Sequence, residues 1–204
     1  MNKSLFPFRL NSQFVIRENS SICQSDIEKI ELASTLSKAS DSRKEEFLRG
    51  RYCAHIALTM LGSPEVKSIG VNDDRSPIWP TGIVGSISHT KMYSMSAVAQ
   101  TDRLEGIGID LESLTRVKEN LARMIQFDND IKSSDKFNSS ELLALTFSAK
   151  ESLYKALYPN VKSFFGFEDA AIVEINEHAF KLELLKDLSS KYVKGIIFEG
   201  NYHI

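Results

Sequence analysis

The order of helical and strand-like patterns is the feature that most constrains the fold of this chain. Apolar residues recur at helical spacing over residues 42–61 and again over residues 138–158. Short strand-like segments follow each helix, at 83–88, 95–99 and 106–111, and then at 170–175, 180–185 and 195–198. This order predicts an α+β protein with two comparable halves, 1–103 and 104–204, each with a small antiparallel sheet packed on helices.

The ends of both helices carry local signals. Ser42-x-x-Glu45 and Asn138-x-x-Glu141 resemble capping boxes, in which two side chains bond backbone N–H groups at a helix start. Gly62-Ser63-Pro64 predicts the end of the first helix, and Tyr158-Pro159 the end of the second. Gly50 lies inside the first helix. A glycine there costs up to ~1 kcal/mol relative to alanine, which indicates close packing against a neighbouring element.

Carboxylates gather in two of these segments. On a strand over 106–111, Asp110 and Glu112 share one face while the alternating apolar residues turn toward the core. Glu151 lies in an apolar stretch of the second helix, where a charge needs a partner or a ligand. Carboxylate oxygens favour Mg²⁺ or Mn²⁺ over zinc, and Mg²⁺ usually completes its shell with substrate phosphates. Each motif alone also fits an ordinary structure: solvated charges at a strand end, or a surface pair of Glu151 with Lys155.

Basic and hydroxyl groups supply a second set of candidates. Arg43 and Arg51 are two helical turns apart at an offset of about 80°, so their guanidinium groups can converge on one anion. The alternative is two solvated arginines on an amphipathic helix. The turn Gly85-Ser86-Ile87-Ser88-His89 offers hydroxyls and an imidazole that suit phosphate, although a lone histidine after a strand is also common as a capping or core residue.

Composition excludes several classes of function. The formal net charge is −2 over 204 residues, which argues against a nucleic-acid-binding protein. No stretch approaches the ~20 apolar residues of a membrane helix, and the first residues lack the apolar run of a secretory signal, so a cytoplasmic protein without membrane contact is expected. Cys23 and Cys53 have no metal-type spacing, and Cys53 falls in the apolar pattern of a helix, as a small core residue does.

Taken in order, these motifs resemble those of the 4′-phosphopantetheinyl transferases, and most of all those of the enterobactin synthase component D type. The resemblance covers residues 40–172. The matching motifs are Arg43-x7-Arg51, Pro77-Ile78-Trp79-Pro80, Gly85-Ser86-Ile87-Ser88-His89, Gly108-Ile109-Asp110-Leu111-Glu112, Phe147-Ser148-Ala149-Lys150-Glu151-Ser152-x2-Lys155-Ala156 and Gly166-Phe167-Glu168-Asp169-Ala170.

The resemblance implies a pseudo-twofold fold of two similar halves with coenzyme A bound in the cleft between them. The implied enzyme is Mg²⁺-dependent, with Mn²⁺ as an alternative metal. It moves the 4′-phosphopantetheine arm of coenzyme A to a serine of an apo acyl or peptidyl carrier protein and releases adenosine 3′,5′-bisphosphate. The first half would hold the 3′-phosphate and adenine, and the second the metal and the catalytic groups. A monomer is expected, because two halves of one chain then complete the site.

The resemblance also assigns roles to single residues. The metal ligands would be Asp110, Glu112 and Glu151, and the contacts to the coenzyme A phosphates would be Arg43, Arg51, Ser88, His89, Lys150 and Lys155. Glu151 is the candidate base for the incoming serine, and Lys155 would stabilise charge on the leaving group. Where relatives often carry a lysine before Pro77, this chain has Asp73-Asp74-Arg75, and Arg75 can take over that contact beside the adenine.

Two other functions remain open on the residues themselves. One is another Mg²⁺-dependent enzyme acting on a nucleotide pyrophosphate without any carrier protein. The other is a non-catalytic relative that binds coenzyme A or a carrier protein, which is expected to have lost a metal carboxylate or the lysine. Carrier proteins are acidic, so a basic docking patch is expected, with Arg116, Lys118 and Arg123 as candidates. The carrier of a siderophore-type peptide synthetase is favoured over polyketide or polyunsaturated fatty-acid synthases.

Overall fold

The computed structural model describes residues 12–64, 69–114, 117 and 119–204. The chain divides into two compact units, of which the first ends at Leu111 and the second is Glu112–Ile204. This division falls later in the chain than the predicted boundary between residues 103 and 104. Each unit combines a long helix with a three-stranded antiparallel sheet, which is the predicted α+β composition.

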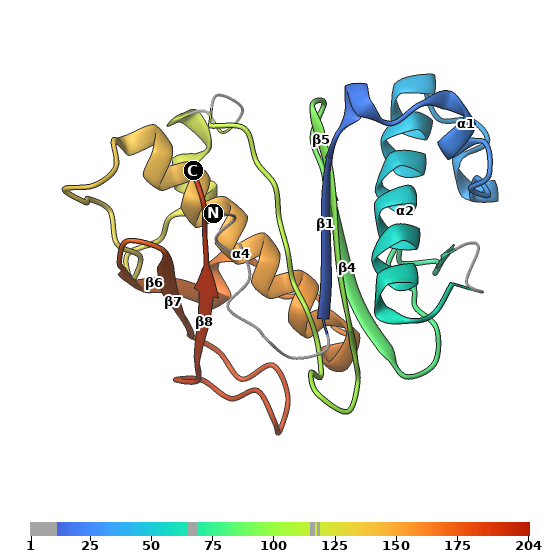
Figure 1. The fold of residues 1–204 in the computed structure, drawn as a ribbon. Helices are drawn as coiled ribbons and strands as arrows, with labels where there is room; N and C mark the ends of the chain where they lie inside the picture. The colour runs from blue at the N-terminus through green and yellow to red at the C-terminus, as the bar shows by residue number, and fades with distance from the viewer. Residues whose placement is uncertain (1–11, 65–68, 115–116, 118) are drawn as a thin grey trace. The chain divides into compact units, whose positions relative to one another are not determined.

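The first unit is built on an antiparallel sheet in the order β1-β5-β4, with α2 lying along it (Figure 1). The strands are β1 (Ser12–Glu18), β4 (Ile83–His89) and β5 (Tyr93–Gln100). The strands predicted over 83–88 and 95–99 are therefore confirmed. Helix α2 (Asp41–Leu61) packs its small and apolar residues on the sheet, and the core includes Val15, Cys53, Ala54, Ala57, Leu58 and Val98.

The boundaries of α2 differ from the prediction at one end. Ser40 is the N-cap, and its hydroxyl accepts a hydrogen bond from the backbone N–H of Arg43 at 3.4 Å. The capping box predicted at Ser42 is wrong, because Ser42 already lies in the first helical turn. The predicted end is confirmed: Gly62 closes the helix at a φ of 99°, a left-handed conformation that favours glycine.

Gly50 is the point of close approach between α2 and β4. A Cβ atom at Gly50 would lie 2.8 Å from Cγ2 of Ile87. The close packing that the sequence indicates at this glycine is confirmed. Since side chains alternate across a strand, Ile87 faces α2, and Ser86 and Ser88 project from the opposite side of β4.

The predicted strand over 106–111 is wrong, since these residues form no strand and run as an extended segment. Its backbone is held by serine hydroxyls: the N–H of Ile109 donates to Ser86 Oγ, and the N–H of Leu111 donates to Ser88 Oγ, both at 3.2 Å. Side-chain oxygens thus replace the carbonyls that a β-ladder would offer. The predicted alternation survives, because Ile107 and Ile109 are buried.

Three short elements complete the first unit, together with a two-stranded hairpin. They are η1 (Asn19–Ser21), α1 (Gln24–Ile27) and η2 (Ser34–Leu36). The hairpin pairs β2 (Gly70–Val71) with β3 (Pro77–Ile78). Trp79 follows β3 and covers Gly85, where a Cβ atom would lie 2.6 Å from the indole ring. The hairpin is thereby packed on β4.

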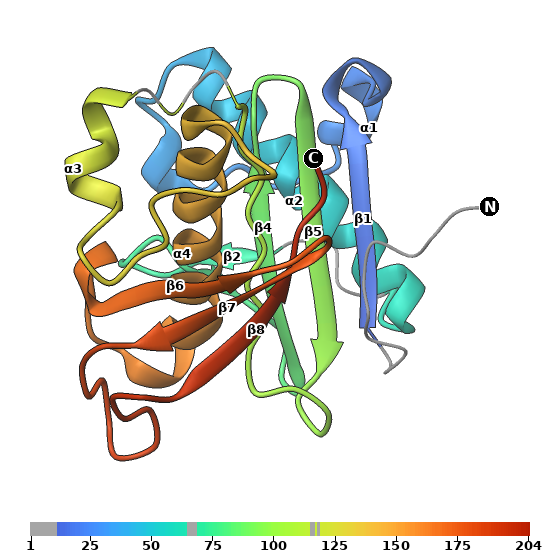
Figure 2. The ribbon, with the colours of Figure 1, turned by 90° about the vertical axis from the view of Figure 1, so that its left-hand side faces the viewer.

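The second unit packs α4 (Ser139–Val161) against an antiparallel sheet in the order β6-β7-β8 (Figure 2). The strands are β6 (Ala170–Ile175), β7 (Ala179–Leu184) and β8 (Ile197–Asn201), and the shorter elements are η3 (Glu119–Leu121), α3 (Ala122–Ile125) and η4 (Phe167–Asp169). The core between helix and sheet includes Leu145, Leu153, Leu157, Ile172, Leu182 and Leu184.

Both ends of α4 can be compared with the prediction. The capping box is confirmed: Glu141 N–H donates to Asn138 Oδ1, and Asn138 N–H donates to Glu141 Oε2, each at 3.0 Å. The predicted end at Tyr158-Pro159 is early, because the helix continues through Pro159 to Val161. Lys162 then closes it at a φ of 54°. Within the described parts of both units, no helix has the length and apolar character needed to cross a membrane.

Candidate functional site

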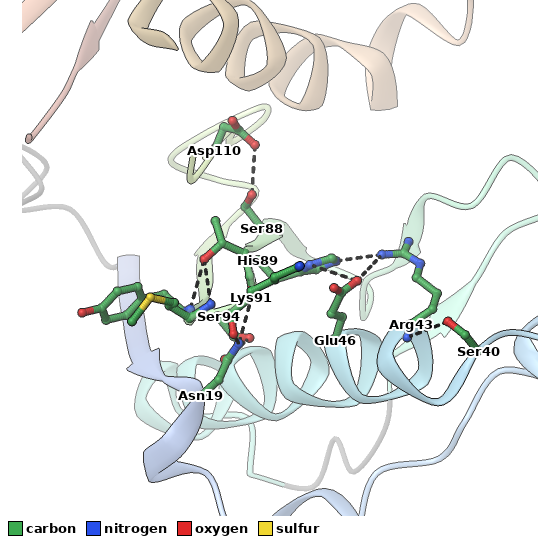
Figure 3. A network of polar contacts seen from close by, with 12 residues as sticks. Asn19, Ser40, Arg43, Glu46, Ser88, His89, Lys91, Ser94 and Asp110 are labelled. Carbon is green, nitrogen blue, oxygen red and sulfur yellow. Dashed lines mark hydrogen bonds and ion pairs between the residues drawn. The ribbon is translucent and has the colours of Figure 1, made fainter. Parts of the chain in front are cut away.

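An arginine, a histidine and a carboxylate form a cluster between α2 and the end of β4 (Figure 3). Nη1 of Arg43 lies 3.1 Å from Nε2 of His89 and 3.4 Å from Oε2 of Glu46. His89 also turns Nδ1 toward the same carboxylate oxygen, at 3.8 Å. Arg43 is half exposed, whereas His89 and Glu46 are each 24% exposed. The structure thus brings together the predicted phosphate ligands Arg43 and His89.

Ser88 joins this strand to the first candidate metal ligand. Its hydroxyl donates to Oδ1 of Asp110 at 2.9 Å (Figure 3). The same hydroxyl oxygen accepts the N–H of Leu111. Ser88 is buried, with 6% of its surface exposed, so these bonds are shielded from competing water. The bond fixes one carboxylate oxygen of Asp110 at the end of the extended segment.

Arg51 is part of the interior of the first unit. Its Nε donates to the carbonyl of Ile69 at 3.0 Å, and its Nη2 donates to the carbonyl of Gly70 at 3.4 Å. The guanidinium carbon lies 4.6 Å from the ring centroid of Phe47, a cation–π distance. Burial lowers the pKa of Arg51 to about 10. Its donors therefore anchor the start of the β2–β3 hairpin.

That hairpin presents Arg75 in an unusual backbone conformation. Arg75 has a φ of 68°, and its N–H donates to the carbonyl of Asn72 at 2.8 Å. Asp74 fixes the turn, because its Oδ1 accepts the N–H of Ser76 at 2.8 Å and the hydroxyl of Ser76 at 2.5 Å. A left-handed conformation is uncommon and costly for a long side chain. Asp74 thus has a structural role, and the exposed Arg75 stands at the tip of the turn.

Lys150 differs from its predicted role. Its ammonium group donates to the carbonyls of Ile125 and Phe167, at 2.9 and 2.8 Å, and to Oδ2 of Asp130 at 2.6 Å. These three bonds account for the three N–H donors of a lysine. Desolvation lowers the pKa of Lys150, and the bond to Asp130 opposes that effect. The structure uses Lys150 inside the second unit, contrary to the phosphate contact expected for it.

The other three candidates belong to the second unit. Glu112 opens that unit, and Glu151 and Lys155 lie one turn apart on α4, all with part of their surface exposed. Among the residues with described positions, no three histidine, cysteine, aspartate or glutamate side chains form a metal-binding group. The metal set of Asp110, Glu112 and Glu151 therefore remains a prediction.

The predicted docking patch is only partly described. Arg116 and Lys118 lie outside the described residues. Arg123 is exposed on α3, next to Met124, whose exposed fraction is 66%. A cation beside an apolar side chain is what a patch for an acidic helical partner requires, so Arg123 stays a candidate.

Comparison with known families decides what kind of protein carries this arrangement. Residues 31–99 match the 4′-phosphopantetheinyl transferase N-terminal domain, and residues 106–204 match the 4′-phosphopantetheinyl transferase superfamily. Enterobactin synthase component D of Escherichia coli K12 is 32% identical over 171 residues, which are 80% of this chain and 78% of that protein. The chain belongs to the 4′-phosphopantetheinyl transferase superfamily. The resemblance to that family and to its component D type is thereby confirmed.

Other relatives of this transferase-family chain match over a smaller share of their length. The 4′-phosphopantetheinyl transferase Npt of Nocardia iowensis is 36% identical over 140 residues, or 67% of this chain and 62% of the relative. Enterobactin synthase component D of Salmonella typhi is 36% identical over 155 residues, or 74% of this chain and 63% of the relative. The matched part of the chain thus spans a little under two thirds of these two proteins.

Sequence reasoning missed two residues that organise the candidate site. Glu46 follows Arg43 by three positions, a spacing that places two side chains on one helix face and that signals the pair. Asp130 lies in a loop without a periodic pattern, and no local signal indicates that it pairs with Lys150. Only the tertiary fold brings that carboxylate to the helix.

Proposed function

We propose that this chain transfers the 4′-phosphopantetheine arm of coenzyme A to a serine of an apo carrier protein and releases adenosine 3′,5′-bisphosphate. One observation carries the proposal: the two family matches cover 31–99 and 106–204, and every candidate phosphate, metal and catalytic residue falls inside one of them. A relative that had only kept the fold would be free to lose these side chains. All of them are present here.

We propose that Mg²⁺ is held by Asp110, Glu112 and Glu151. The donor chemistry fits, because all three offer carboxylate oxygens and Ser88 already fixes one oxygen of Asp110. When bound, Mg²⁺ neutralises charge on the pyrophosphate oxygens of coenzyme A. Mn²⁺ fits the same oxygen ligands.

The remaining steps are assigned to side chains of the chain itself. Arg43 and His89 would bind the 3′-phosphate of coenzyme A, and Arg75 would contact phosphate beside the adenine. Glu151 would take the proton from the serine hydroxyl of the carrier at its carboxylate, directly or through a water. Lys155, one turn further along α4, would donate N–H groups to the phosphate that leaves with adenosine. Positioning and charge neutralisation are the main requirements of phosphoryl transfer.

The carrier is proposed to be an apo acyl or peptidyl carrier protein, an acidic helical domain that meets the exposed Arg123. Two of the relatives are named for enterobactin synthase, which favours the carrier domain of a siderophore-type peptide synthetase. The protein is proposed to act as a monomer.

The test is the intact mass of an apo carrier protein after incubation with this chain, coenzyme A and Mg²⁺. The expected result is a gain of one phosphopantetheine, lost with a chelator and with Glu151→Gln. Glu174→Gln is the matched control, since Glu174 lies in the same unit and is paired with Lys181 at 2.7 Å. It should leave the mass gain intact. No gain with any of several apo carriers, from a folded protein that binds coenzyme A, would reject the transferase activity.

A further inference from the structure

The carboxylate of Glu46 lies beside the two side chains that are proposed to bind phosphate, Arg43 and His89. Its Oε2 lies 3.4 Å from Nη1 of Arg43 and 3.8 Å from Nδ1 of His89. An arginine N–H can only donate, so Nε2 of His89 accepts from Arg43, and the ring proton sits on Nδ1, toward Glu46. One carboxylate oxygen thus faces both groups (Figure 3).

We propose that Glu46 is an internal competitor of the 3′-phosphate, a specificity-determining residue that weakens binding of every ligand carrying this phosphate. This inference rests on the proposed function, because it takes Arg43 and His89 as the 3′-phosphate ligands. It adds a residue whose charge opposes the 3′-phosphate, whereas Arg43 and His89, the side chains assigned to that phosphate, would attract it.

The charge balance supports a net opposition. A phosphate oxygen accepts hydrogen bonds only, so the 3′-phosphate would compete with Glu46 for the N–H groups of Arg43 and His89 that face this carboxylate. Glu46 sits on the same rigid helix as Arg43, three residues away, and cannot leave the cluster without breaking that ion pair. At 24% exposure the carboxylate is partly shielded, so solvent screens its repulsion of phosphate only in part.

This arrangement has a consequence for the reaction cycle. The 3′-phosphate is present both in coenzyme A and in the released adenosine 3′,5′-bisphosphate. A change that strengthens binding of this phosphate therefore raises the affinity for both ligands. A carboxylate that keeps this affinity moderate favours departure of the product, since uniformly tight binding slows release without assisting chemistry.

The experiment compares Glu46→Gln with Glu45→Gln in binding to coenzyme A and to 3′-dephospho-coenzyme A by titration calorimetry at low salt. Glu45 is the neighbouring acid on α2 and is paired with Arg49 at 3.0 Å, so its variant removes the same charge without touching the cluster. Glu46→Gln is expected to bind coenzyme A about two- to fivefold more tightly, the range of a partly exposed charge interaction. Its affinity for the dephospho ligand should stay unchanged, and Glu45→Gln should alter neither.

The outcomes separate the inference from the function on which it rests. If the unaltered protein binds both ligands equally well, the 3′-phosphate subsite itself is rejected. If the protein prefers coenzyme A and Glu46→Gln weakens that ligand, or shifts both ligands equally, the competitor role is overturned. A gain confined to coenzyme A that shrinks as the salt concentration rises supports it, because salt screens partly exposed charges.

Discussion

Nζ of Lys150 lies 2.6 Å from Oδ2 of Asp130, and the two side chains are 2% and 0% exposed. Asp130 also accepts the N–H of Phe127 and the N–H of Ile172, each at 2.8 Å. The pair therefore joins α4 to β6 and to the segment after α3. Lys150 thus has a structural role, although it is the direct neighbour on α4 of Glu151, the proposed base.

Breaking this pair should strongly destabilise the second unit. Lys150→Met leaves the Asp130 carboxylate buried without its cation, so the free energy of unfolding is expected to fall by about 3–5 kcal/mol in urea titrations. Lys132→Met is the control, because Lys132 forms an exposed pair with Asp128 at 2.9 Å, and the loss of a solvent-screened pair should lower the free energy of unfolding far less. Equal losses of unfolding free energy in the two variants would mean that the buried pair contributes no more to stability than the exposed pair.

Ser88→Ala and Ser86→Ala should differ in their effect on the metal. Each removes a buried hydroxyl that accepts one backbone N–H, so each should lower the free energy of unfolding by about 1–3 kcal/mol. Only Ser88 also bonds Asp110. Ser88→Ala alone is therefore expected to raise the Mg²⁺ concentration for half-maximal transfer, by about tenfold. A similar shift in Ser86→Ala would assign the effect to general loosening of the segment.

Arg75 offers a way to separate backbone strain from ligand binding. Arg75→Gly and Arg75→Ala both remove the guanidinium, but only glycine adopts a φ of 68° without strain. The glycine variant should be more stable than the alanine variant by about 0.5–1 kcal/mol, because relief of strain exceeds the entropy lost on folding. Both should bind coenzyme A more weakly, as measured by calorimetry. Equal stabilities would show that the turn relaxes at no cost.

The buried thiol of Cys53 should make the stability of the fold depend on alkaline pH. Burial raises the pKa of Cys53 from 9.0 to about 12, so above pH 9 the thiol ionises in the unfolded chain while it stays protonated in the folded one. The stability that this protonated thiol supplies is present below pH 9 and is lost progressively as the pH rises toward 12.

Urea titrations at pH 8 and pH 10 measure this loss. The linkage relation assigns about 1.4 kcal/mol of the fall between these pH values to Cys53. Cys53→Ala should reduce the fall by that amount, whatever its cost at pH 8. A fall that persists in full in Cys53→Ala would contradict the protonated buried thiol.

The elements with a strong periodic pattern could be predicted from the sequence. Helices α2 and α4 and strands β4, β5, β6 and β7 follow from apolar spacing, and the capping box at Asn138 follows from a four-residue motif. Strand β8 begins two residues later than the strand predicted over 195–198. The segment 106–111 has the same alternation as a strand, but serine hydroxyls satisfy its amides, and apolar spacing carries no information about hydrogen-bond partners.

The candidate site was predictable in composition and less so in arrangement. The sequence indicates Arg43, His89 and Asp110, and the structure places the first two in one cluster and the third beside Ser88. The sequence does not indicate that Lys150 and Arg51 turn inward, because an apolar helix face only shows that a charge needs a partner. Which partner it finds, Asp130 or the carbonyls of Ile69 and Gly70, depends on loops without a pattern of their own.

Ser86 and Ser88 of β4 also fix the register of the segment 109–111 against this strand. Amides two residues apart meet hydroxyls two residues apart, so inserting or deleting one residue between Ile109 and Leu111 would break the match and turn Asp110 to the other side. The loop 101–106, which comes before the first of these bonds, is under no such constraint. Length changes among homologous chains should therefore accumulate before residue 107 and be excluded from 109–111.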